Sequence, residues 1–187
     1  MTELKKIRHK LMKRYLRGST SWSNYWYMKI LRQEGYYTYR FFLHLRKYEY
    51  LIKQKTTLWI TFRRVWHLMQ YSRFAVKCGF SIGDGVLGED VTIYHRGNIL
   101  INPNARVGEG CIIHGSCCIG TGHLDNDKCP VIGKNVEIGY GAVLLGDIRI
   151  ADDIIIGANS VVTKSFEEPG IVIAGVPAVK IRNRTDR

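Results

Sequence analysis

The chain has 187 residues and a formal net charge of +12. Its five Cys are an odd number, which argues against a disulfide framework of the kind found in small secreted domains and favours reduced thiols. No early apolar run resembles a signal peptide, and no stretch of about 18 apolar residues would span a membrane. These properties predict a cytoplasmic protein.

The positive charge lies in the first part of the chain. Residues 1–78 contain eighteen Lys or Arg and three Asp or Glu, whereas residues 79–187 contain ten and thirteen. All four Trp and nine of the eleven Tyr precede Gly79, and seventeen of the nineteen Gly lie from Gly79 onward. We therefore predict a basic, aromatic-rich α-helical region over 1–78 and a second domain over 79–187.

Three segments of the first part are predicted to be helical: residues 3–17, about 36–54 and about 57–77. In the third, apolar residues recur at three- and four-residue steps, with Thr57 as N-cap and Gly79 as the end signal. We expect the aromatic side chains to pack on the second domain or on another subunit. Lys and Arg interleaved with Trp and Tyr also suit peripheral contact with an anionic membrane. No nucleic-acid-binding motif accompanies the charge, so no nucleic acid partner is expected.

The second part shows a six-residue repeat of branched aliphatic residues. The frame is interrupted by a loop over 121–131 and resumes at Ile132. Gly often follows the aliphatic residue, and the fifth position of a six is often small. The ten aliphatic positions are Ile101, Val107, Ile113, Ile119, Ile132, Ile138, Leu144, Ile150, Ile156 and Val162.

A six-residue period matches neither an α-helix nor an ordinary array of hairpins. It is typical of a solenoid with three flat faces per coil, in which each six supplies a short strand and a corner. The aliphatic side chain points inward and stacks on that of the next coil. The predicted fold is therefore mainly β, a parallel β-helix preceded by a short helical region. A β-helix that serves only as a scaffold or membrane adaptor is the alternative without chemistry.

The repeat contains its distinctive segments in a fixed order. YHRGNILINPNARVGEGCIIHGSCCIG is followed by the loop TGHLDNDKCP, then by VIGKNVEIGYGAVLLGDIRIADDIIIGANSVVTKSF and by AGVPAVKI. Over about residues 79–183 this order resembles the hexapeptide-repeat acyltransferases, and among them the serine acetyltransferase branch. The resemblance implies a left-handed parallel β-helix, a homotrimer with active sites between subunits, and acetyl-CoA as the acyl donor.

By this resemblance His95 is the catalytic general base. An alcohol is a weak nucleophile toward a thioester at neutral pH. An imidazole with a pKa of about 6.5 can take its proton and return it to the departing thiolate. Backbone N–H groups at Gly120 and Thr121 are candidates for stabilising the oxyanion of the bound acetyl-CoA. Direct attack needs no covalent intermediate, so no Cys is expected to act as a nucleophile.

The acceptor side departs from serine acetyltransferases. Where they carry an Asp that orients the base, this chain has Ser81, a possible orienting residue with Asp84, Glu89 and Asp90 as alternatives. Where they carry Asp immediately before the base, this chain has Tyr94. An aromatic ring suits a sugar better than an ammonium group, although Tyr94 as a plain surface residue is an equal alternative.

Two further residues are expected to line the acceptor site. Lys128 stands in the run Lys128-Cys129-Pro130, where the family has Arg-His-Pro. His114 follows the inward Ile113 and is either an acceptor contact or a polar corner residue. These departures resemble the capsular, exopolysaccharide and lipopolysaccharide O-acetyltransferases of the branch.

By the same resemblance, small residues flank the pantetheine arm of acetyl-CoA. Tyr140 departs from the small residue common at its position and would narrow the groove. The positions matched to the arm are Gly139, Tyr140, Ala142, Gly157 and Ala158. The cations expected to meet the CoA phosphates are Lys164, Lys180, Arg182 and Arg184.

No metal is expected, since His114, His123 and Cys129 match no compact zinc motif. The predicted function is acetyl-CoA-dependent O-acetylation of a sugar hydroxyl in surface polysaccharide biosynthesis. The alternatives are serine O-acetylation in cysteine biosynthesis and a non-catalytic trimeric β-helix scaffold or membrane adaptor.

Overall fold

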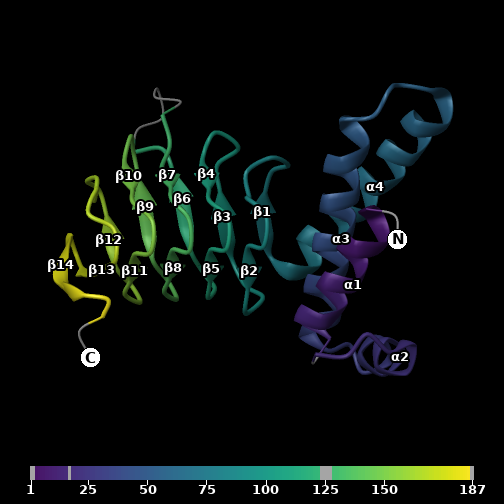
Figure 1. Cartoon of the computed structure of the whole chain (residues 1–187), viewed down its shortest axis with the longest axis horizontal. Coiled ribbons are helices and arrows are strands. Elements are labelled where there is room, and N and C mark those ends of the chain that lie inside the picture. The colour runs from purple at the N-terminus through teal and green to yellow at the C-terminus, as the bar shows by residue number, and fades with distance from the viewer. Residues whose placement is uncertain (1–2, 17, 123–127, 186–187) are drawn as a thin grey trace. The chain divides into compact units, whose positions relative to one another are not determined.

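The chain divides into two units, Met1–Gly79 and Phe80–Arg187, and each is described by itself. The computed structural model shown in Figure 1 describes residues 3–16, 18–122 and 128–185. The first unit is built of helices and the second of short strands.

The described residues of the first unit form four helices: α1 (Glu3–Tyr15), α2 (Trp22–Ile30), α3 (Glu34–Ile52) and α4 (Leu58–Cys78). The sequence pattern predicts three of them and misses α2, which has nine residues. The side chain of Ser21 caps α2 by accepting a hydrogen bond from Ser23 N at 3.2 Å. Tyr25 and Met28 are its buried residues. A helix this short depends on such packing more than on its own periodicity.

The start and end signals predicted for α4 are both confirmed. Thr57 Oγ1 accepts a hydrogen bond from Ile60 N at 3.2 Å, and Gly79 is left-handed with a φ of 75°. Because Gly has no Cβ, it adopts this conformation at little cost and ends the helix.

The core of the helical unit is aromatic and centred on α3, which packs against α1 and α4. Phe41, Phe42 and Leu45 are at most 1% exposed. Tyr15 of α1 stacks on Phe42, with ring centroids 5.4 Å apart. All four Trp, in contrast, are at least 50% exposed. The unit therefore buries Phe and Tyr and keeps its Trp at the surface.

The described strands of the second unit form three sheets. Sheet A contains β1 (Phe80–Ile82), β3 (Ile99–Ile101), β6 (Cys118–Gly120), β9 (Val143–Leu145) and β12 (Val161–Val162). Sheet B contains β4 (Arg106–Val107), β7 (Val131–Ile132) and β10 (Arg149–Ile150). Sheet C contains β2 (Thr92–Ile93), β5 (Ile112–Ile113), β8 (Glu137–Ile138), β11 (Ile155–Ile156), β13 (Ile171–Gly175) and β14 (Ala178–Asn183).

The chain visits these sheets in rotation, so the unit is a parallel β-helix (Figure 1). Neighbouring strands are parallel except β13 and β14, which form an antiparallel pair at the end of sheet C. Ile101 pairs with Ile119, eighteen residues on, and each coil therefore uses three sixes. The fold predicted from the hexads is confirmed.

The inward direction of the aliphatic residues is confirmed as well. All ten predicted positions are at most 3% exposed. Register places them on top of one another: Ile113 pairs with Ile138, and Ile138 with Ile156. The small fifth positions, such as Ala105 and Ser160, are fully buried beside them.

The corners connect the sheets. The C-to-A corner comprises the segments that leave β2, β5, β8 and β11 and enter β3, β6, β9 and β12. The A-to-B corner includes the segment between β6 and β7. There Val107 pairs with Ile132, twenty-five residues on, so the loop adds seven residues to one coil. The loop residue His123 lies outside the described residues.

Candidate active site

The C-to-A corner brings the predicted base and an acceptor residue into neighbouring coils. Tyr94 N donates to Ile113 O at 3.0 Å, and His95 N donates to His114 O at 3.1 Å. His114 N in turn donates to Ile138 O at 3.0 Å. The strand ladder therefore continues into the corner and fixes the backbone of both histidines. The side chain of His95 is exposed.

Gly115 allows Tyr140 of the next coil to lie beside His95. A Cβ on Gly115 would lie 3.2 Å from the Tyr140 ring and 3.6 Å from the Cβ of His95. The φ of Gly115 is +155°, which side chains rarely adopt. Ser116 Oγ donates a hydrogen bond to the Tyr140 hydroxyl at 3.0 Å and holds the ring in place. Of these three residues, only Tyr140 is predicted from the sequence, and Gly115 and Ser116 were missed.

A second pair of groups lies one step along the same corner. His114 Nε2 lies 2.8 Å from Glu137 Oε1, and both side chains are about one third exposed. A carboxylate only accepts hydrogen bonds, so Nε2 of His114 carries the proton. The Tyr94 ring is tilted by 46° against the His114 ring, with the two centroids 5.2 Å apart. Glu137 was missed from sequence, because its neighbour in space is twenty-three residues away.

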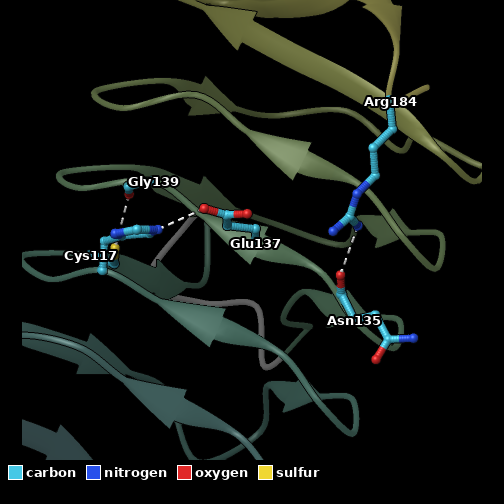
Figure 2. Close-up of polar contacts among 6 residues, drawn as sticks. Cys117, Asn135, Glu137, Gly139 and Arg184 are labelled. Atoms are coloured by element: carbon cyan, nitrogen blue, oxygen red, sulfur yellow. Dashed lines mark hydrogen bonds and ion pairs between the residues drawn. The ribbon is translucent and has the colours of Figure 1, made fainter. Parts of the chain in front are cut away.

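Two buried thiols of the β-helix, Cys117 at this corner and Cys111 between β4 and β5, are not poised for nucleophilic chemistry. Burial raises the pKa of Cys111 to about 11 and also raises the pKa of Cys117. The Cys117 thiol donates to Gly139 O at 3.3 Å, as Figure 2 shows. A thiol that is buried, neutral and engaged in a hydrogen bond is a poor nucleophile. Neither Cys111 nor Cys117 is therefore expected to act as a nucleophile.

The predicted pantetheine residues follow His95 along the same corner in later coils. Tyr140 is 53% exposed and Ala158 is exposed, but Ala142 is fully buried. Ala142 N donates to Gly139 O, and its carbonyl accepts from Cys118 N. A Cβ on Gly139 would lie 2.6 Å from Ala158 N. Contact between coils therefore requires a small residue at 139, whether or not a ligand lies outside. Gly157 lies one coil further along and is partly exposed.

Another part of the predicted site lies at the A-to-B corner. Gly120 ends β6, Thr121 follows it, and Lys128 Nζ pairs with Asp147 Oδ2 at 2.8 Å. The three-residue strands of sheet A separate this corner from His95 by roughly 10 Å. The two groups therefore do not converge within one chain. A Cβ on Gly120 would meet no described atom within 4 Å, so packing in this chain does not explain that glycine.

The remaining predicted residues lie in β1 and in the closing segment. Ser81 is an exposed residue of β1 that pairs with Leu100, and its role toward His95 stays a prediction. Lys180 Nζ pairs with Glu168 Oε1 at 2.7 Å, and Lys164 Nζ lies 5.5 Å from the Phe166 ring centroid. Arg182 is an exposed residue of β14.

Arg184 lies near the sheet C side of the coils. Its Nη1 donates to Asn135 O at 3.2 Å (Figure 2). The same nitrogen lies 3.9 Å from Asp153 Oδ1. These contacts hold the closing segment against earlier coils. The role of the closing-segment cations toward CoA phosphates stays a prediction.

Over 3–16, 18–122 and 128–185, no group of three or more His, Cys, Asp or Glu is arranged to hold a metal ion. Within those same ranges, every helix is too short or too polar to cross a membrane.

Comparison with known proteins places the β-helix unit among transferases. Residues 129–164 match the family model described as bacterial transferase hexapeptide (six repeats). A serine acetyltransferase of Mycobacterium tuberculosis is 41% identical over 104 residues, which are 54% of this chain and 45% of that protein. The putative colanic acid biosynthesis acetyltransferase WcaB of Escherichia coli K12 is 32% identical over 117 residues, 61% of this chain and 72% of that protein.

A solved structure is similar over nearly the whole chain. Soybean serine acetyltransferase apoenzyme has a TM-score of 0.69 and 25% identity, and the match covers 95% of this chain and 69% of that one. The match to the mycobacterial relative, in contrast, spans less than half the length of that protein.

Proposed function

Because this chain belongs to the bacterial hexapeptide-repeat transferase family, we propose that it is an acetyl-CoA-dependent O-acetyltransferase that acts on a sugar hydroxyl. The observation that carries the choice of acceptor is the surface next to His95. Tyr94 is 54% exposed and lies beside the ring of His114. An exposed aromatic ring with a polar neighbour suits a sugar, which presents both C–H faces and hydroxyls.

The chemistry follows from the exposed imidazole of His95. The imidazole takes the proton of the acceptor hydroxyl while its oxygen attacks the thioester carbonyl. The C–S bond then breaks, and the imidazolium returns the proton to the departing thiolate. The products are the O-acetyl ester and CoA, and His95 is restored. Cys111 and Cys117 take no part, because both thiols are buried and neutral.

A homotrimer would complete this site. Gly120, Thr121 and Lys128 lie one sheet away from His95 in the same chain. A second copy that presents its A-to-B corner to the C-to-A corner of the first would bring the two groups together. The backbone N–H groups at Gly120 and Thr121 would then stabilise the oxyanion, and the open space over Gly120 would admit the thioester.

The second candidate is serine O-acetylation, which is favoured by the relatives and the solved structure that carry that name. The sugar reading is supported by the relative named for colanic acid biosynthesis and by Tyr94 beside the base. A cytoplasmic location and peripheral contact of the basic helices with a membrane remain predictions of the same proposal.

Thiol release from acetyl-CoA separates these candidates. We expect turnover with nucleotide-sugars or with oligosaccharide repeat units, and little with L-serine. Efficient turnover of L-serine would replace the sugar proposal by serine acetylation. Calorimetry with acetyl-CoA tests the class of protein, since a chain that fails to bind it would be a scaffold.

A further inference from the structure

A cavity of about 320 Å³ lies within the helical unit, between the end of α2, the start of α3 and the second half of α4. Its described lining contains no acidic side chain. Five of the lining residues are cationic: Lys29, Arg32, Arg40, Arg73 and Lys77. Such a concentration of one charge in a concave site raises the local concentration of anions.

Arg40 is the deepest of these cations and is held by uncharged groups. Its Nη1 donates to Tyr25 Oη at 3.0 Å and to Tyr36 Oη at 3.4 Å, and its Nη2 lies 3.0 Å from His44 Nε2. The guanidinium also lies 4.9 Å from the Phe74 ring centroid. Arg40 Nε is buried and has no hydrogen-bond partner. Among the described residues, no carboxylate contacts this guanidinium.

The groups around Arg40 do not supply a negative charge. Burial, followed by a hydrogen bond with Tyr25, raises the pKa of Tyr36 to about 12, so its phenol stays neutral. Burial and the charge of Arg40 lower the pKa of His44 to about 3, so its imidazole is neutral too. The Arg40 side chain is partly buried, with a buried Nε, and burying a charge that is paired with no opposite charge is costly. The cavity therefore lacks a counter-anion that its chemistry favours.

The geometry and charge together indicate the class of ligand. Arg presents a planar fork of N–H donors that matches phosphate oxygens, and Lys adds point charges around it. A volume of about 320 Å³ admits a diphosphate with part of the group that carries it. The aromatic rings of Tyr36 and Phe74 form an apolar wall beside the cations.

We propose that this cavity binds a phosphate or diphosphate group, either on a soluble ligand or on a lipid headgroup. The inference stands on the helical unit alone and does not depend on the reaction proposed for His95. It assigns the basic region a specific binding site in place of a general attraction for anions.

The test uses the full chain and inorganic pyrophosphate as the probe in isothermal titration calorimetry at about 150 mM salt. We expect saturable binding that Lys77→Gln weakens about tenfold, the effect of losing one partly exposed charge-assisted contact. Arg73→Gln should act similarly, and both residues are exposed at the rim, so these variants should fold. The matched control is Lys55→Gln, which removes the same charge from an exposed lysine outside the cavity. It should change affinity by less than about twofold.

Two further arms identify the source of the phosphate. The first measures uridine diphosphate binding, and the second measures flotation with phosphatidylcholine vesicles that contain phosphatidic acid. If Lys77→Gln weakens only the first, the ligand is soluble; if it weakens only the second, the ligand is a lipid. If Lys77→Gln weakens both uridine diphosphate binding and vesicle flotation, the site recognises the phosphate group itself.

The inference is overturned if pyrophosphate fails to saturate. It is overturned equally if Lys55→Gln weakens binding as much as Lys77→Gln does, since the attraction would then be that of net charge alone. Residual binding at the cations of the closing segment does not confuse the result, because those residues belong to the other unit and are unchanged in every variant.

Discussion

Each unit of the chain has a core built from its own kind of side chain, and the two units balance their charges differently. The β-helix buries a column of Ile, Val and Leu, and the helical unit buries Phe and Tyr around α3. Cations of the β-helix pair with acids, as Lys180 does with Glu168 and Lys128 with Asp147. The helical unit has three acidic residues for eighteen basic ones.

This difference shows how each unit is specified. In the β-helix a residue's place in the six decides whether it points inward, because every coil repeats the last. In the helical unit the place of a residue depends on which helices meet, and the period of one helix does not encode that. Excess cations then gather without acids around a cavity, as they do at Arg40.

The largest expected effect tests whether the β-helix unit carries the catalytic base. His95→Ala should lower kcat by at least about 100-fold, since positioned acid–base assistance is worth about 10²–10⁴. Acetyl-CoA affinity should stay near that of the unmodified chain. The rate of thiol release from acetyl-CoA at saturating substrate gives kcat, and calorimetry gives the affinity for acetyl-CoA. The control is His9→Gln, an exposed histidine of α1. A small effect of His95→Ala would move the base elsewhere, with His114 as the next candidate.

The next effect tests whether the two cores are independent. Ile138→Ala and Leu45→Ala both truncate fully buried side chains and should each cost about 2–5 kcal/mol of unfolding free energy. All four Trp belong to the helical unit, so Trp fluorescence reports on that unit alone. Leu45→Ala should shift the fluorescence transition in urea. Ile138→Ala should leave it in place and shift only the transition seen by circular dichroism. A shift of the fluorescence transition by Ile138→Ala would show one cooperative unit, because circular dichroism reports on both units and Leu45→Ala shifts that signal in either case.

Lowering the pH should reduce the stability of the helical unit more than that of the β-helix. Burial is the first cause that lowers the pKa of His44 to about 3 and of His67 to about 4. Arg40 can only donate, so neutral His44 accepts at Nε2 and donates from Nδ1 to His67 Nδ1, 2.9 Å away. The unfolded chain takes up protons below about pH 6.5, while the folded pair stays neutral.

Stability from this pair is therefore complete above about pH 6.5 and falls as the pH drops toward 4. The slope is at most about 1.4 kcal/mol per pH unit for each proton. Urea unfolding followed by Trp fluorescence between pH 7.5 and 4.5 measures it, and His67→Gln should flatten the profile. The buried thiols of the β-helix, with raised pKa values, contribute no such loss in acid. An unchanged transition across this range would contradict the neutral pair.

The sequence predicts most of the β-helix and less of the rest, for physical reasons. The hexads fix the ten aliphatic inward positions from Ile101 to Val162, because one rule applies to each coil. Predicting which residues of neighbouring coils are in contact also requires the length of the loop. Once seven extra residues are counted, Glu137 falls beside Ile112 and within reach of His114. The helix α2 and the cavity beside it are set by packing between helices, for which no periodic signal exists.

The smallest effect tests whether an acid in the β-helix positions a group at the site or only balances charge. Glu137→Gln keeps the shape but weakens the hydrogen bond that orients His114, a partly exposed contact worth about 1 kcal/mol. The KM for the acceptor should rise about fivefold, with kcat and the KM for acetyl-CoA little changed. The matched control is Glu109→Gln, which removes an exposed partner of Lys134 at 3.6 Å in the same unit. It should leave both KM values unchanged, because surface pairs of this kind contribute little. If both variants alter the acceptor KM equally, the effect comes from the charge of the unit, and His114 has no oriented role at the C-to-A corner.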